Sequence, residues 1–227
     1  MDEHRNLKLY DQLLQFPLFQ GMSRSEMLQL AGNTRFGFHK MATGKTVVKD
    51  GDECRQLLFL INGCITITSK SDDYSYQMTE WLSAPWLIQP EVLFGTATRY
   101  TLTARADSDC HFIILSKDEV MRLLDDFFIF RLNLFNLLSA QCQRHTHSAW
   151  RRSPRTLEER IVRFFSDHSL YPAGKKELHI MMEQLAVEVD HTRLNVSRIL
   201  NDMQQRELIQ LSRGRIIIPM LERLFMQ

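Results

Sequence analysis

The sequence has no long apolar run and only four cysteines, and both features narrow the class of protein. No stretch of about 18 apolar residues occurs, so a membrane-spanning helix is not expected. The N-terminus, Met1-Asp-Glu-His-Arg, lacks the basic and then apolar profile of a signal peptide. The cysteines form no C-x-x-C pair, and scattered single cysteines suit a reducing cytosol. We therefore expect a soluble, cytoplasmic protein.

Catalytic and metal-binding motifs are also missing. No nucleophile elbow, P-loop or Ser/His/Asp spacing is evident. A cupin-like enzyme would need His and carboxylate ligands inside a barrel, but the β-rich region holds only His39 and His111. No N-terminal cysteine cluster suits an iron–sulfur centre. Cys142, His145 and His147 resemble a ligand set only loosely, because His147 does not share a helix face with the other two. We expect no enzyme activity, metal or cofactor.

The composition is that of a folded protein with two domains. The 227 residues are 44% hydrophobic and 24% charged, with a formal net charge of +1. That average hides an asymmetry: from Arg144 onward there are 14 Lys/Arg and 10 Asp/Glu, against 14 and 17 before it. The basic C-terminal part is where a nucleic-acid partner is expected.

The first half changes from helical to β-rich. Residues 7–33 have helical periodicity, interrupted at Phe16-Pro17, and Ser23 with Glu26 fits a capping box. Short runs rich in β-branched and aromatic residues then occupy 34–115, separated by turns such as Asp50-Gly51 and Asn62-Gly63. This pattern predicts a closed all-β sandwich or barrel.

A long helix is expected from Ser116 to about Arg144. Apolar residues recur at alternating spacings of four and three, which is one heptad seam that ends at Gln141. The seam consists of Leu123, Phe127, Phe130, Leu134 and Leu137. Further apolar residues widen the surface, so the helix needs cover on two sides. We expect one side to pack on the β-domain and the other to meet a second copy in a homodimer; the alternative is burial within its own domain alone.

The C-terminal part contains two helices joined by a tight turn. The segment from His145 to Pro154 is polar and basic and reads as a linker, and Thr156 with Glu159 caps a helix after it. A helix is expected over residues 182–189, a break at Asp190-His191, and a second helix from Arg193 to about Arg206 capped by Thr192. Residues 208–219 form a hairpin with its tip at 212–214. The order helix, turn, helix, hairpin predicts a winged helix-turn-helix.

The exposed face of the second helix is the expected DNA-reading surface. Arg193 and Arg198 can each contact guanine with two hydrogen bonds, and Asn195 can address adenine or a phosphate. Thr192 at the helix start suits a phosphate. In the hairpin, Arg213 and Arg215 are candidates for phosphate contacts.

The sequence resembles the cyclic-AMP receptor protein and fumarate–nitrate regulator (Crp/Fnr) family over nearly its whole length. The segments that carry the resemblance are 190–200, Glu207-Leu-Ile and the strand 212–218 in the C-terminal half, and the turn glycines around Gly44, Gly51 and Gly63 in the N-terminal half. The resemblance implies a β-roll sensor domain, a dimerisation helix and a winged-helix DNA-binding domain.

Two departures from the family pattern change what is expected to be bound. The base-contacting positions fall on Arg193, Leu194 and Arg198, and the middle position is usually Glu in familiar members. Leu194 offers only apolar contact, for instance to a thymine methyl. The resemblance also places a Gly-Glu and an Arg-Ser pair around a cyclic phosphate.

At those cyclic-phosphate positions this chain has Pro90-Glu91 and, in place of the Arg-Ser pair, Tyr100-Thr101, with Arg99 one residue away. Proline lacks the amide donor, and a one-residue offset on a strand turns a side chain to the other face. We expect cyclic AMP to bind weakly or not at all. Glu91, Arg99, Tyr100 and Thr101 remain candidates to line a pocket for another effector, and the alternative is a pocket filled with side chains.

The sequence therefore predicts an α+β protein with three parts. An N-terminal double-stranded β-helix, a jelly-roll-like β-roll with flanking helices, is expected over residues 1–115. The dimerisation helix follows over 116–147 and the winged helix-turn-helix over 148–227. The expected partners are double-stranded DNA, a second copy and an unknown small-molecule effector; RNA polymerase is a candidate partner of an activator. The alternatives are a ligand-binding or protein-interaction module without DNA binding, and a cyclic-AMP-responsive regulator with an altered pocket.

Overall fold

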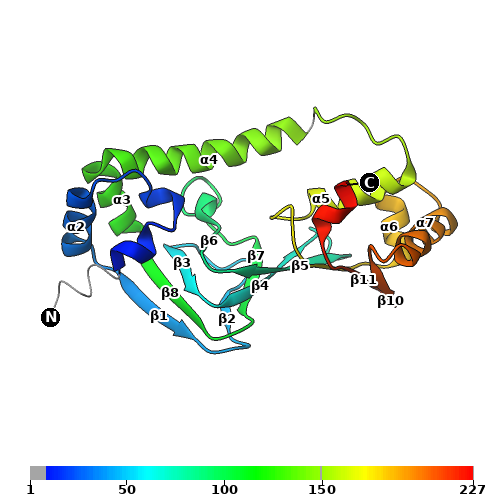
Figure 1. Cartoon of the computed structure of the whole chain (residues 1–227), viewed down its shortest axis with the longest axis horizontal. Coiled ribbons are helices and arrows are strands. Elements are labelled where there is room, and N and C mark those ends of the chain that lie inside the picture. The colour runs from blue at the N-terminus through cyan, green and yellow to red at the C-terminus, as the bar shows by residue number, and fades with distance from the viewer. Residues whose placement is uncertain (1–8, 149, 227) are drawn as a thin grey trace. The chain divides into compact units, whose positions relative to one another are not determined.

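The computed structural model describes residues 9–148 and 150–226, which fall into two compact units (Figure 1). Unit 1 contains the described residues up to Ile65, together with Ser83–Tyr100 and those from Ala106 to Arg151. Unit 2 contains Thr66–Leu82, Thr101–Arg105 and the described residues from Arg152 onward. The predicted α+β class is confirmed. The units interleave along the chain, so they do not follow the predicted domain boundaries, which stay predictions.

Unit 1 combines a β-sheet with helices from both ends of its sequence. Its elements are η1 (Pro17–Phe19), α2 (Arg24–Asn33), β1 (Gly37–Met41), β2 (Thr46–Val48), β3 (Gln56–Asn62), β6 (Trp86–Ile88), η2 (Pro90–Val92), β8 (Cys110–Ser116), α3 (Lys117–Asp126) and α4 (Phe128–Ser148). Four strands form an antiparallel sheet in the order β1-β8-β3-β6, with Leu58 opposite both Ile114 and Ile88. These strands all lie within residues 34–115, so the predicted β-rich region is confirmed.

An aromatic cluster joins the N-terminal segment, the sheet and α4. The Phe59 ring on β3 lies 5.0 Å from that of Phe16 and 5.6 Å from that of Phe19, and Phe19 lies 5.4 Å from Phe130 on α4. Asn133 on α4 donates from Nδ2 to the carbonyls of Leu18 (3.1 Å) and Gln20 (2.8 Å). These contacts satisfy the backbone groups that the proline break leaves without helical partners.

The N-terminal turn and cap predictions are confirmed where the structure describes them. Pro17 begins a 3₁₀ turn, and Ser23 and Glu26 form both hydrogen bonds of the capping box at the start of α2. These side-chain and backbone hydrogen bonds lower the pKa of Glu26. The predicted start of the first helix at residue 7 lies outside the described residues.

The prediction of one long helix from Ser116 is wrong. The chain forms α3 and α4 instead, and Phe127 between them has an extended backbone with φ −124° and ψ 105°. Ser116 caps α3 by accepting the Glu119 N–H at 3.2 Å. Asp125 and Asp126 close α3, and two carboxylates at a helix C-terminus oppose its dipole, which favours the break. The predicted linker also begins too early, because residues 145–148 continue α4.

Unit 2 is built around the C-terminal helices and a sheet. Its elements are β4 (Cys64–Lys70), β5 (Gln77–Ser83), β7 (Leu102–Ala106), α5 (Leu157–Asp167), β9 (Lys176–His179), α6 (Met182–Glu188), α7 (Arg193–Gln205), β10 (Gln210–Ser212), β11 (Arg215–Ile218) and η3 (Leu221–Phe225). A few terminal residues of β4, β5 and β7 belong to unit 1. Within unit 2 the strands follow the order β10-β11-β9-β5-β4-β7. β5 lies in the predicted β-rich region, whereas β9 was not predicted from the sequence.

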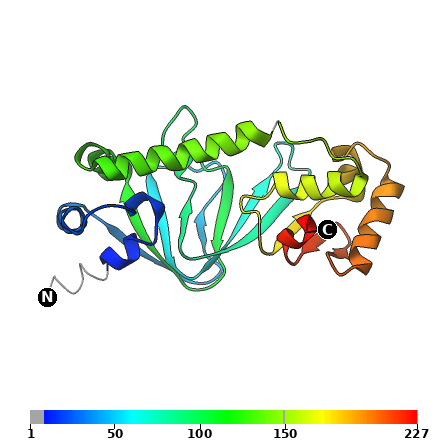
Figure 2. The same cartoon turned by 45° about the horizontal axis from the view of Figure 1, so that its top comes forward.

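The core of unit 2 packs helices against this sheet. Buried side chains from α5, α6 and α7 meet Leu178 of β9 and Ile216 and Ile218 of β11. Both views show η3 (red) beside α5 (yellow), and η3 adds Leu221 and Leu224 to the cluster (Figures 1 and 2). Met78, on β5, belongs to the same cluster. No helix in the described part of the chain is long and apolar enough to span a membrane.

Gly63 provides a test of the β-roll turns, because both its positive φ and the close approach of neighbouring atoms disfavour a side chain there. Gly63 and Gly95 share a φ of +97°, but a Cβ at Gly63 would lie 2.5 Å from the Asp109 carbonyl oxygen, whereas one at Gly95 meets nothing within 4 Å. We expect Gly95→Ala to lower the free energy of unfolding by about 1 kcal/mol through backbone strain alone. Gly63→Ala adds a steric clash and should cost at least about 3 kcal/mol. Urea unfolding measures both, and equal losses would contradict the close approach at Gly63.

Candidate nucleic-acid interface

The helix-turn-helix forms as predicted. Helix α6 ends one residue before the predicted bound, and α7 runs from Arg193 to Gln205 with Arg206 as its C-cap. Asp190 takes a left-handed φ of +51°, and the His191 N–H bonds to the Ala186 carbonyl at 2.9 Å. Ala186 is buried in the core that α6 and α7 share, where a small side chain lets the helices approach closely. Val196, Leu200 and Met203 bury one face of α7, so the opposite face must point outward.

The outward face of α7 gathers five of the predicted DNA-binding residues. Thr192 is the N-cap and accepts the Asn195 N–H at 3.4 Å, and Arg193, Asn195 and Arg198 are exposed. Leu194 is 79% exposed, although its side chain is apolar. A shallow groove along this face is lined by Leu194, Asn195, Ser197, Arg198, Asn201, Asp202 and Gln205. The surface therefore offers hydrogen-bond donors and acceptors beside one apolar group.

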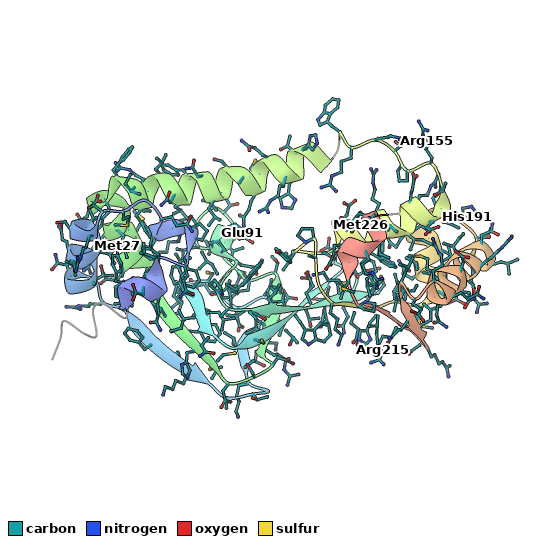
Figure 3. All side chains as sticks on the ribbon, in the orientation of Figure 1. Met27, Glu91, Arg155, His191, Arg215 and Met226 are labelled. Carbon is teal, nitrogen blue, oxygen red and sulfur yellow. The ribbon has the colours of Figure 1, made fainter. Side chains whose placement is uncertain are left out.

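His191 is a site residue that sequence reasoning missed (Figure 3). Its Nδ1 accepts the Thr192 N–H at 2.9 Å and lies 3.2 Å from Asn195 Nδ2. Because Nδ1 accepts a backbone proton, the neutral imidazole carries its own proton on Nε2. The ring thus holds Asn195 and presents a donor at the start of α7, where a phosphate would lie. The only sequence signal was its place in the turn.

Two of the predicted arginines are already paired. The Arg193 guanidinium lies 3.0 Å from Glu183 on α6, and both side chains are largely exposed. Arg215 on β11 lies 3.4 Å from Glu177 on β9, which also bonds His179 at 2.7 Å. The Arg193–Glu183 pair is exposed on both sides, and exposed ion pairs contribute little to stability. Arg213 is exposed at the hairpin turn, next to Gly214 with a φ of +67°.

The predicted effector residues of unit 1 point to separate partners. Glu91 on η2 lies beneath α4 (Figure 3), and its two carboxylate oxygens each lie 3.4 Å from an amide nitrogen, of Gln89 and of Gln141. Arg99 donates to the Gly51 carbonyl at 2.6 Å. Tyr100 is buried, and that burial raises the pKa of its hydroxyl. These three side chains are therefore held by protein groups rather than directed at one point.

Thr101, the fourth predicted effector residue, belongs to unit 2 and is exposed before β7. The four residues share no common set of contacts here, since adjacent residues on an extended segment face opposite ways. That they line an effector pocket stays a prediction.

The predicted dimer seam is mostly buried within unit 1. Leu123, Phe127, Phe130 and Leu134 belong to its core, and Leu137 is half-buried. The predicted seam therefore faces the core of unit 1, and a different stripe of α4 faces outward. Phe128, Leu132 and Phe135 are exposed at spacings of four and three, with Phe128 at 62% and Phe135 at 56%. Any partner helix would meet this second stripe.

Two family models match the sequence. The cyclic nucleotide-binding domain matches residues 38–127 and the Crp-like helix-turn-helix domain residues 159–225, together more than two-thirds of the chain. A comparison with curated proteins finds no significant match.

Solved structures share the fold at low identity. The Thermus thermophilus catabolite activator protein is 20% identical with a TM-score of 0.52, over 92% of this chain and 97% of that one. A putative Crp/Fnr-family regulator from Eubacterium rectale is 19% identical with a TM-score of 0.51, over 93% and 97%. The sensor domain of the regulator DNR from Pseudomonas aeruginosa is 18% identical with a TM-score of 0.53, over 68% and 98%.

The order of the parts agrees with these matches. A β-roll precedes two helices and a winged helix-turn-helix, and the exposed face of α7 lies inside the matched DNA-binding domain. The cyclic nucleotide-binding match covers the strands from β1 to β8. The chain belongs to the Crp/Fnr family of DNA-binding transcription regulators.

Proposed function

We propose that the chain is a cytoplasmic regulator that binds a twofold-symmetric DNA site as a homodimer. The observation that carries the proposal is the face of α7, where Leu194, Asn195 and Arg198 are exposed on a helix whose opposite side is buried. A helix of this kind fits the major groove with its N-terminal turn toward the bases. Arg213 is exposed on the neighbouring hairpin, where we expect it to contact a phosphate.

The homodimer is proposed from the outward stripe of α4. Phe128, Leu132 and Phe135 would leave three large apolar side chains in water if α4 had no partner. Their four-and-three spacing is that of a helix seam that packs against a copy of itself about a twofold axis. Two copies of α7 would then read two half-sites, which accounts for the twofold symmetry of the proposed site.

We propose an effector other than cyclic AMP. Pro90 removes one amide donor, the Glu91 carboxylate is engaged by Gln89 and Gln141, and Arg99 is bonded to Gly51. A cyclic phosphate needs a charged partner, and breaking these contacts to supply one costs binding free energy.

Selection of binding sites from random DNA tests the proposed reader. We expect a twofold-symmetric site whose half-site places a thymine methyl against Leu194, because that side chain has no hydrogen-bonding group. The matched variant Leu194→Glu should move the preference at that base pair toward cytosine, whose amino group a carboxylate accepts. A site without symmetry would contradict the dimer. The usual family half-site recovered unchanged by the wild type would contradict the role of Leu194.

Arg198 and Arg213 should affect affinity in different ways. Arg198→Ala should cost about 1–3 kcal/mol on the selected site and relax specificity at one position, because a base contact is lost. Arg213→Ala should weaken binding to all sequences alike and reduce the salt dependence by about one ion. Titrations by fluorescence anisotropy at several salt concentrations measure both. The control is Arg24→Ala, which removes an exposed charge on α2. If the wild type shows no salt-sensitive affinity for DNA, a protein-interaction module is favoured instead.

Calorimetry with cyclic AMP tests the effector proposal. We expect no heat of binding at micromolar concentrations, because the residues that would hold the phosphate and the ribose are engaged elsewhere. Glu91→Gln should leave the isotherm unchanged, since the carboxylate has no ligand to lose. Binding with a micromolar Kd would overturn the proposal and favour a cyclic-AMP-responsive regulator with an altered pocket.

A further inference from the structure

Strand β5 is paired with the DNA-binding part of the chain. Residues 77–80 of β5 run antiparallel to Lys176–His179 of β9, with Met78 opposite Leu178 and Glu80 opposite Lys176. β5 lies inside the segment matched by the cyclic nucleotide-binding model, and β9 lies inside the segment matched by the helix-turn-helix model. Both strands nevertheless belong to one compact unit. We call the paired residues 77–80 and Lys176–His179 the β5–β9 latch.

One face of β5 is part of the DNA-binding core. Met78, Glu80 and Leu82 alternate along the strand and are all buried, and Met78 packs in the cluster that also holds the buried faces of α6 and α7. Tyr76 extends this contact: its ring lies 5.4 Å from Phe164 on α5, and its hydroxyl lies 3.1 Å from His168 Nε2. Separation of β5 from β9 would therefore expose apolar surface of the core.

A buried ion pair lies at one end of the latch. The Lys176 ammonium is 2.7 Å from Glu80 Oε1, and the two side chains are 0% and 1% exposed. Further hydrogen bonds surround the pair: Glu80 accepts the N–H groups of Leu170 (2.8 Å) and Tyr171 (3.2 Å), and Lys176 donates to the Ala173 carbonyl (2.9 Å). A buried charge is tolerated when it is paired and hydrogen-bonded in this way, and removal of one partner leaves the other uncompensated.

The ion pair specifies the register of the two strands. A slip by one residue would turn Glu80 or Lys176 to the opposite face of the sheet. A slip by two residues would keep the faces but set Lys176 opposite Met78 or Leu82, both buried and apolar. Either alternative buries a charge without its partner. Only one alignment of β5 on β9 is therefore favourable.

The latch gives the DNA-reading helix a second attachment to the rest of the chain. Without the latch, α7 and the wing would be connected to the preceding part of the chain only through the polar segment between α4 and α5. With it, the sheet order β10-β11-β9-β5 joins the wing to the β4–β5 hairpin. The wing strand β10 lies at the edge away from β5, and Leu194 and Arg198 stay exposed, so the latch leaves the DNA-reading surface open.

We propose that the β5–β9 latch fixes the orientation of the DNA-reading helix for binding to a twofold site, and that the Glu80–Lys176 pair sets its register. The inference rests on the proposed function. A twofold site demands a set separation and direction of two helices, and an orientation fixed beforehand reduces the entropy lost on binding. Binding of unrelated DNA has no such demand, because it depends on phosphate contacts.

Two single variants are expected to separate β5 from β9 because each removes one charge of the buried ion pair. Lys176→Met leaves the Glu80 carboxylate without a counter-charge. Glu80→Gln places an amide NH2 against donors in either orientation, because one carboxylate oxygen accepts from Lys176 and the Tyr171 N–H and the other from the Leu170 N–H. The control is Glu53→Gln: Glu53 and Arg55 form an ion pair of the same 2.7 Å length but are exposed. An exposed pair of this kind should contribute little to stability.

Hydrogen exchange on the full-length protein tests the register. We expect the amides of β5 and β9 to lose protection at least tenfold in both latch variants, while those of β3 and β8 in unit 1 stay within twofold of the wild type. The unit 1 amides separate local opening from unfolding of the whole chain. Unchanged protection of β9 would overturn the ion pair as the register determinant, and so would the same loss in Glu53→Gln.

DNA titration of the same variants tests the coupling. We expect the Kd for the selected twofold site to rise at least tenfold, while the Kd for a duplex of unrelated sequence changes less than twofold. An unchanged Kd for the twofold site despite lost protection would overturn the coupling, and tighter binding would show that the latch inhibits instead. If the wild type binds no DNA, the proposed function fails and the coupling with it, while the exchange experiment still decides the register.

Discussion

A charge that leaves water must find its partners inside the protein, and this constraint organises unit 2. The Glu80–Lys176 pair has no exposure, so the strands that carry it and the loop that completes its hydrogen bonds must all be in place together. The positions of β9, of the α5–β9 loop and of the core beneath them follow from that requirement. The exposed face of α7 is dictated by the same core, because its buried face packs there.

The helix-turn-helix could be predicted because its signals are local. Thr192 caps a helix whose apolar residues follow within three turns, and the preceding break needs only the left-handed Asp190. Leu194 and Arg198 fall on the outward face by periodicity alone. His191 was missed because its role depends on which ring nitrogen faces the Thr192 amide, and residue spacing carries no such information.

Other features were missed because they depend on contacts far apart in sequence. Glu80 interrupts the apolar alternation of β5 and Lys176 that of β9, so neither reads as a buried strand until the two charges, 96 residues apart, are seen to face each other. The break at Phe127 has no proline or glycine that would have predicted it. The acidic end of α3 was the available signal, and the apolar run that continues through it concealed the break between α3 and α4.

Strand β5 also has a consequence for how the chain can be divided or inherited. The family boundaries would assign this strand to the sensor and its partner β9 to the DNA-binding domain. A C-terminal domain exchanged between relatives at those boundaries would arrive with a buried lysine and meet whatever residue the new sensor carries at the position of Glu80. The two halves are therefore not independent modules in evolution: a substitution at one of these two positions restricts what the other can become.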